Sequence, residues 1–115
     1  MKNLKFLVTT FLLTTLAIGN AWAATNGDVF TRISAVGDLA DGDEIIFVKA
    51  SNDGACGTTQ NTNNRNRVSI STTNNSYTYD SGDDVQVFVV KKDGNNYGFH
   101  TGNGYIYSAA NNNNY

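Results

Sequence analysis

Tight-turn sequences interrupt this chain at short intervals, and they constrain its fold more than any other feature. Asn and Gly enter positive φ at little cost, so their pairs with each other, Asp or Ser are typical of turns between short strands. Such sequences occur at Asp41-Gly42, Asn52-Asp53-Gly54, Asn74-Asn75, Ser81-Gly82, Asp93-Gly94 and Asn103-Gly104. Proline is absent, and no stretch after residue 24 repeats apolar residues at helical spacing. The sequence therefore predicts an all-β chain.

The segments between these turns are short apolar runs or alternate between apolar and polar residues, as strands do. We expect strands at residues 29–34, 44–50, 67–71, 76–80, 85–91, 97–101 and 105–108. Residues 45–48 and 85–90 are apolar at nearly every position, so both faces of these two strands should be buried. They should form the centre of a small antiparallel sandwich or partly open barrel. Residues 58–66 contain no apolar side chain, which predicts a long exposed loop.

The first 23 residues have the features of a signal peptide. Lys2 and Lys5 precede an uncharged stretch at residues 6–19, and Ala21-Trp22-Ala23 supplies the small-x-small pattern of a cleavage site. The apolar run is roughly 14 residues long, whereas a membrane-spanning helix needs about 20, so we expect no integral membrane span. Cleavage after Ala23, or at the neighbouring Ala24, would leave one all-β domain of residues 24–115. The protein should be secreted or displayed at the cell surface.

The charge of the exported part limits its partners. Removing Lys2 and Lys5 leaves six basic residues against ten acidic ones, a formal charge of −4. Nucleic acids and anionic membranes both favour clustered Lys and Arg, so neither is expected as a partner. Arg65 and Arg67 lie close together, on either side of Asn66. This pair could hold an anion, or it could lie on a solvated loop surface.

Few residues carry the chemistry of catalysis. His100 is the only histidine, Glu44 the only glutamate and Cys56 the only cysteine. With a single histidine, a Ser-His-Asp triad cannot be placed from the sequence. A glycosidase needs two carboxylates across a cleft, whereas the aspartates of this chain sit in turns. No basic residue lies next to Cys56 in the sequence, so a buried or free thiol is favoured over a nucleophile. We therefore expect a protein that is not an enzyme and that has no cofactor.

Two groups of acidic residues are candidates for calcium. Asp38, Asp41, Asp43 and Glu44 lie within seven residues, and Asp80, Asp83 and Asp84 surround Gly82. Calcium prefers oxygen ligands, but the spacing is not that of an EF-hand, and aspartate in turns explains both groups without a metal. The sequence therefore predicts no metal site.

The last aromatic residues predict a hairpin with one apolar and one polar aromatic face. A turn centred on Asn103-Gly104 would pair His100 with Tyr107, and a turn centred on Gly102-Asn103 would pair His100 with Tyr105. Either register places His100, Tyr105 and Tyr107 on one face. The other face, which should be the core side, would carry Tyr97, Phe99, Thr101, Ile106 and Ser108. The two tyrosines and the histidine could stack against a sugar ring, or they could pack under further strands.

Three segments follow one another in a distinctive order: FTRISAVGDLADGDEIIFV, GTTQNTNNRNRVSI and DVQVFVVKKDGNNYGFHTGNGYIYSA. In this order and spacing they resemble the N-terminal half of an all-β module of secreted and surface proteins of Bacteroidota, over residues 28–115. The resemblance implies an extracellular adhesive or glycan-related setting and no catalytic residues. It also implies that the module continues into further strands, so that this chain would be an incomplete domain.

Two functions follow as hypotheses. The first is a secreted, non-catalytic binding or adhesion module for an extracellular glycan or another cell-surface component. Its ligand-binding residues would be His100, Tyr105, Tyr107 and Arg65. The second is a structural spacer, or a fragment of a larger secreted protein, with no ligand of its own.

Overall fold

The computed structural model describes residues 4–6, 12–14, 24–62 and 64–106. This part of the chain consists of short strands and two single turns of 3₁₀ helix, which confirms the predicted all-β class. The strands are β1 (Leu4–Phe6), β2 (Leu12–Thr14), β3 (Val29–Thr31), β4 (Glu44–Ile45), β5 (Gly54–Gln60), β6 (Arg65–Ser69), β7 (Ser76–Thr78), β8 (Phe88–Asp93) and β9 (Asn96–His100). The 3₁₀ turns are η1 (Val36–Asp38) and η2 (Ser81–Asp83).

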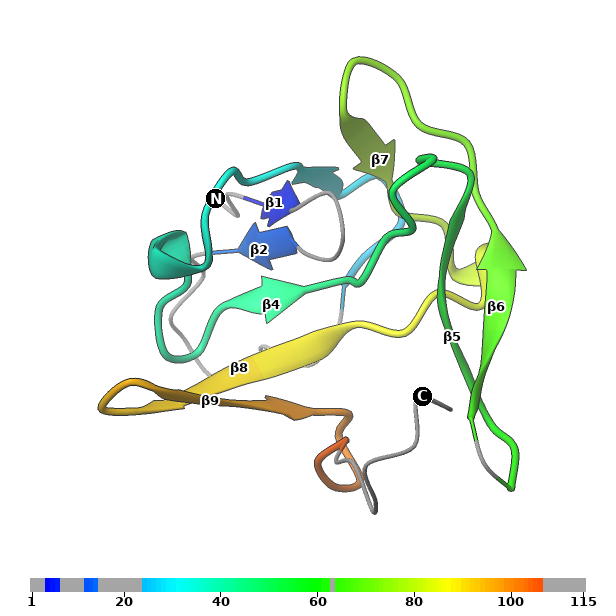
Figure 1. Cartoon of the computed structure of the whole chain (residues 1–115). Helices are drawn as coiled ribbons and strands as arrows, with labels where there is room; N and C mark the ends of the chain where they lie inside the picture. Colours follow the sequence, from blue (N-terminus) through cyan, green and yellow to red (C-terminus); the bar gives the residue numbers. More distant parts are fainter. Residues whose placement is uncertain (1–3, 7–11, 15–23, 63, 107–115) are drawn as a thin grey trace.

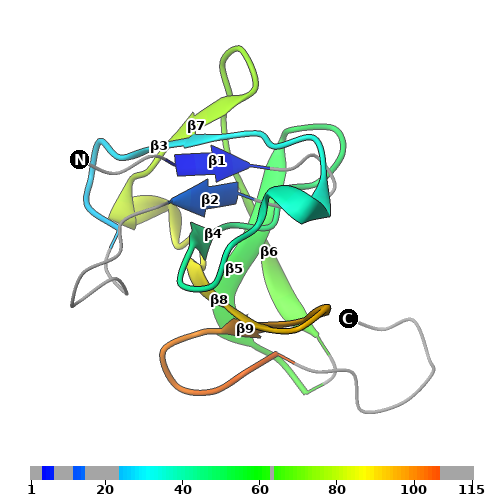
Figure 2. The ribbon, with the colours of Figure 1, turned by 90° about the vertical axis from the view of Figure 1, so that its left-hand side faces the viewer.

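The strands form three small sheets with the orders β2-β1-β3-β7, β4-β8-β9 and β5-β6. Neighbouring strands are antiparallel except β1 and β3, which run parallel. The β5–β6 hairpin lies to the right of the other two sheets in Figure 1 and behind them in Figure 2. The sheets do not close into a barrel, so the sandwich-like arrangement describes the fold better than the partly open barrel.

The two segments predicted to be buried on both faces do form the centre of the core. Ile45, Ile46 and Val48 are at most 1% exposed, and Phe88 and Val90 are completely buried. The Phe47 ring lies edge-on to Phe88 at 4.9 Å and to Phe99 at 5.0 Å between ring centroids. Phe47 thereby joins the β4 segment to β8 and β9. Phe30 on β3 and Tyr77 on β7 belong to the same buried cluster and come from the β2-β1-β3-β7 sheet.

The predicted loop at residues 58–66 is wrong, because most of it is a hairpin. β5 continues to Gln60 and β6 begins at Arg65, so only a short connection separates the two strands. Polar groups hold the pair: Asn66 Oδ1 accepts a hydrogen bond from the Thr59 amide at 2.9 Å, and Gln60 Nε2 donates to the Asn64 carbonyl at 3.0 Å. Outer parts of this hairpin are exposed, so an apolar pattern is not required for strand pairing there.

The predicted strand at residues 44–50 is shorter than expected because its second half changes partner. Glu44 and Ile45 pair with β8, whereas Val48 forms a bridge with Ala55 at the start of β5. The Cys56 amide also donates to the Phe47 carbonyl at 3.0 Å. The segment therefore passes from the β4-β8-β9 sheet to the edge of the β5–β6 hairpin. The other strands predicted up to residue 101 are present with shifted ends. Of the strand predicted at residues 105–108, the structure describes residues 105 and 106, where Tyr105 forms an isolated bridge with His100.

β1 and β2 belong to the segment that the sequence predicts to be a signal peptide. They pair with each other, and β1 joins the edge of β3 (Figure 2). Within the described ranges, no helix has the length and apolar character needed to cross a membrane.

Candidate functional site

The turn after β9 adopts the second of the two predicted registers. His100 forms a bridge with Tyr105, and the Thr101 amide donates to the Gly104 carbonyl at 2.8 Å, which centres the turn on Gly102 and Asn103. Gly102 has φ +101°, a conformation that other residues rarely adopt. The Gly102 amide donates to His100 Nδ1 at 3.0 Å and so fixes the orientation of the imidazole. The turn therefore positions His100 as well as reversing the chain.

Tyr105 presents an exposed ring beside His100. The two ring centroids are 4.7 Å apart at an interplanar angle of 88°, and 53% of Tyr105 is exposed. A Cβ atom placed on Gly98 would lie 3.2 Å from two carbons of the Tyr105 ring, so the ring lies directly over the glycine backbone. The Tyr105 ring is thus supported on two sides and open to solvent on another.

The opposite face of the hairpin packs against the core as predicted. Tyr97, Phe99 and Ile106 all contact the buried cluster. Alternation along the strand therefore turns His100 and Tyr105 outward. Tyr107, the third predicted member of the aromatic face, lies outside the described residues.

Arg65 lies in β6, and its guanidinium is used inside the molecule. It donates to the Gly57 carbonyl at 3.2 Å, to the Thr58 carbonyl at 2.9 Å and to Gln86 Oε1 at 2.7 Å. Its central carbon also lies 5.9 Å from the centroid of the Phe88 ring. Gln86 in turn donates to the Thr101 carbonyl at 3.3 Å. Arg65 therefore connects the β5–β6 hairpin to β8 and, through Gln86, to the base of the aromatic hairpin.

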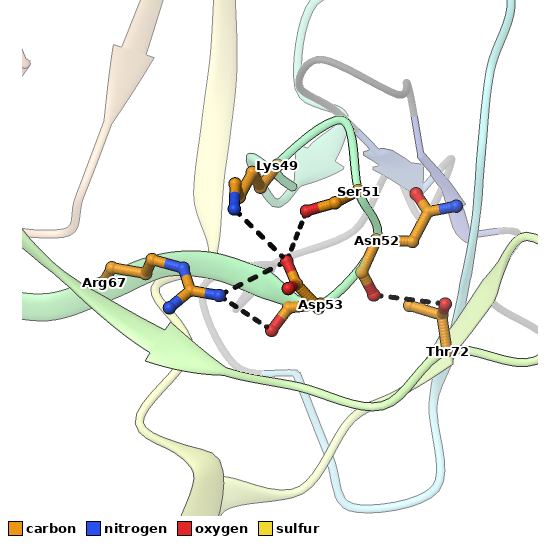
Figure 3. A network of polar contacts seen from close by, with 6 residues as sticks. All are labelled: Lys49, Ser51, Asn52, Asp53, Arg67 and Thr72. Carbon is orange, nitrogen blue, oxygen red and sulfur yellow. Dashed lines mark hydrogen bonds and ion pairs between the residues drawn. The ribbon is translucent and has the colours of Figure 1, made fainter.

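Arg67 belongs to a separate polar network at the other end of β6 (Figure 3). Its guanidinium lies 3.2 Å from the Asp53 carboxylate, which Lys49 also approaches at 3.7 Å. The Ser51 hydroxyl donates to the same carboxylate. This hydrogen bond, followed by the charges of Lys49 and Arg67, lowers the pKa of Asp53. The network fastens the turn at residues 49–53 to β6, so the two arginines flanking Asn66 serve different structural contacts.

The acidic residues around Asp41 stabilise a turn and a strand end. Asp41 Oδ1 accepts a hydrogen bond from the Lys92 amide at 2.8 Å, and the Asp43 carboxylate accepts one from the Ala40 amide. Asp43 and Glu44 are both buried. In the part of the chain that the structure describes, no three His, Cys, Asp or Glu side chains gather in a group that could hold a metal ion.

Cys56 is half-buried on β5. Burial raises the pKa of its thiol, and the nearby Arg65 only partly opposes this effect. A higher pKa leaves less thiolate, which is the reactive form of cysteine, at neutral pH. The environment of Cys56 therefore disfavours nucleophilic chemistry.

A polar groove beside β7 was missed by the sequence reasoning. It has a volume of about 590 Å³ and is lined by segments at residues 26–27, 69–73 and 76–83. The Tyr77 hydroxyl donates to Asp83 Oδ2 at 2.9 Å and accepts a hydrogen bond from the Asp80 amide at 3.3 Å. Tyr77 and Tyr79 alternate with polar residues in β7 and just after it, a pattern that marked the strand but gave no sign of a groove. The hydrogen bonds of Tyr77 hold η2 against β7.

Comparison of the chain with protein-family models, with curated proteins and with solved structures gives no match in any of the three. The resemblance to the Bacteroidota module therefore stays a prediction from the sequence.

Proposed function

We propose that this protein is a secreted, non-catalytic binding module that recognises a saccharide at the cell surface through Tyr105 and His100. The observation that carries the proposal is the Tyr105 ring, which is 53% exposed yet held by the edge contact with His100 and by the backbone of Gly98. A ring that is already ordered loses little conformational entropy when a ligand stacks on it.

The chemistry of the face suits a sugar. The apolar side of a pyranose ring can stack on the tyrosine, while the phenol hydroxyl can bond the hydroxyl groups of the sugar. Arg65 stabilises the base of this hairpin indirectly, because it donates to the side chain of Gln86, which in turn donates to the Thr101 carbonyl. Export follows from the signal peptide predicted for residues 1–23.

A glycan array, followed by titration of any glycan that binds, tests this proposal. Tyr105→Ala should weaken binding at least tenfold and should leave the melting temperature nearly unchanged, because the ring is exposed. Gly98→Ala should also weaken binding, since the new Cβ would displace the Tyr105 ring. Val36→Ala is the matched control, because Val36 is 47% exposed on η1.

The opposite result would favour the spacer. If no glycan binds the parent protein and Tyr105→Ala melts much earlier, the tyrosine serves packing instead of recognition. Equal glycan binding by the parent and by Tyr105→Ala would also remove the proposed site.

A further inference from the structure

The β1–β2 hairpin fills one edge of the sheet that contains β3. β1 runs parallel to β3 with Leu4 opposite Phe30 and Lys5 opposite Thr31, and β2 lies on the outer side of β1. The hairpin lies between β3 and β4 in Figure 2, and residues of both its strands contact β4. The two strands that it separates carry Phe30 and Ile45, which are completely buried in the structure of the whole chain.

The backbone of β3 shows which groups the hairpin occupies. On its other side β3 pairs with β7, and the Arg32 amide donates to the Asn75 carbonyl at 3.0 Å. Main-chain groups of an extended strand alternate in direction, so those of Val29 and Thr31 point toward β1. Signal peptidase would remove β1 and β2 with the rest of residues 1–23. Val29 and Thr31 would then lie on an open strand edge.

We propose that the cleaved protein uses this β3 edge as a strand-acceptor site, which takes an extended apolar segment of a partner polypeptide running parallel to β3. Open edges bind added strands through main-chain hydrogen bonds. The strand found there in the uncut chain, Leu-Lys-Phe, indicates the chemistry of the partner segment: apolar residues around a basic one. A basic partner also suits a cleaved chain with a formal charge of −4. The proposal rests on the predicted cleavage and is independent of the saccharide site.

The test uses two forms of the protein, residues 1–115 and residues 24–115, with a fluorescent peptide of residues 2–15 (KNLKFLVTTFLLTT) as the probe. The peptide should bind residues 24–115 saturably. It should bind residues 1–115 at least tenfold more weakly, because the β1–β2 hairpin of that form already occupies the β3 edge. Hydrogen exchange should show that bound peptide slows the Val29 and Thr31 amides at least tenfold. If residues 24–115 are loosely folded alone, the peptide should restore protection throughout β3 and β7.

Modified peptides separate strand addition from apolar adhesion. The register directs the amide groups of Leu4 and Phe6 toward β3, so N-methylation of these two should weaken binding at least tenfold. A scrambled peptide of the same composition should not bind. Saturable binding with these losses supports the proposal.

Several results would overturn it. Absent peptide binding, or equal binding of the N-methylated and scrambled peptides, would remove the acceptor site. A dimer of residues 24–115 in which Val29 and Thr31 are already protected would assign the edge to a second copy of this chain instead of a different partner. Exported protein that still begins at Met1 would remove the premise, while leaving the saccharide test at Tyr105 unaffected.

Discussion

At the scale of single residues, Arg65 contributes more to the stability of the fold than its position in a polar stretch of the sequence would suggest. Its guanidinium makes three hydrogen bonds and faces the buried Phe88 ring. Hydrogen bonds of charged groups are worth more than neutral ones, so Arg65→Ala should lower the free energy of unfolding by about 2 kcal/mol. Urea unfolding measures the change. Arg32→Ala, at an exposed position on the surface, should cost about 0.5 kcal/mol or less, and equal losses for the two variants would contradict this role.

Cys56 gives a second prediction at the residue scale. Because burial raises the pKa of its thiol above the ordinary 9.0, little thiolate is present near pH 8 in the folded protein. Alkylation by iodoacetamide should therefore be at least tenfold slower in the native protein than in urea, where the same single cysteine is exposed. The native rate should continue to rise with pH beyond 9.0. A native rate that matches the unfolded one would show that the thiol is freely accessible.

At the scale of elements, close contacts within the β5–β6 hairpin require glycine on β5. A Cβ atom on Gly57 would lie 2.2 Å from Asn66 Oδ1, so Gly57→Ala must displace the side chain that accepts the Thr59 amide. We expect a loss of about 1–2 kcal/mol in the free energy of unfolding. Adding Asn66→Ala should relieve the clash and so recover part of the lost stability, although the hydrogen bond to the Thr59 amide is then absent.

The control for this prediction is Gly104→Ala. Nothing lies within 4 Å of the Cβ position at Gly104, so this change should have a small effect. Similar losses for Gly57→Ala and Gly104→Ala would mean that the hairpin tolerates a wider separation of its side chains.

The same hairpin shows where prediction from sequence succeeds and where it fails. Residues 45–48 and 85–90 were assigned to the core from their side chains alone, because burial of both faces leaves an uninterrupted apolar run. Residues 58–66 were missed because Asn66, Gln60 and Arg65 stabilise the strands by polar contacts that carry no apolar periodicity. Turn chemistry limited the aromatic hairpin to two registers, and the His100–Tyr105 bridge selects one of them. The partners of Arg65 depend on tertiary contacts that no local pattern encodes.

At the scale of the whole molecule, Tyr77 links the core to the groove beside β7. Its ring is buried against Phe30, with 6.4 Å between the ring centroids, and its hydroxyl reaches Asp83 on η2. Burial is the largest cause that raises the pKa of Tyr77 above its ordinary value. The hydrogen bond to Asp83 and the negative charge of its carboxylate raise this pKa further. Tyr77 therefore makes the stability of the whole fold sensitive to alkaline pH.

Whether the free energy of unfolding rises or falls with pH follows from the protonation of Tyr77 in the unfolded and the folded state. In the unfolded chain Tyr77 loses its proton near pH 10, whereas in the folded protein the proton is retained to higher pH. Its contribution to stability is complete below the unfolded pKa and is lost as the pH rises through the folded one. The free energy of unfolding should thus be steady from about pH 7 to 9 and should fall above about pH 10.

Tyr77→Phe tests this account. The variant should lose about 1 kcal/mol at pH 7, because the hydrogen bond to Asp83 is gone. Above about pH 10, however, its free energy of unfolding should fall less steeply than that of the parent, by up to about 1.4 kcal/mol per pH unit for one titrating group. Tyr79→Phe is the matched control: burial raises its pKa too, but the residue is only half-buried, so the slope should change less. Urea unfolding at pH 7, 9, 10 and 11 measures both variants, and parallel curves for the parent and Tyr77→Phe would show that Tyr77 does not control alkaline unfolding.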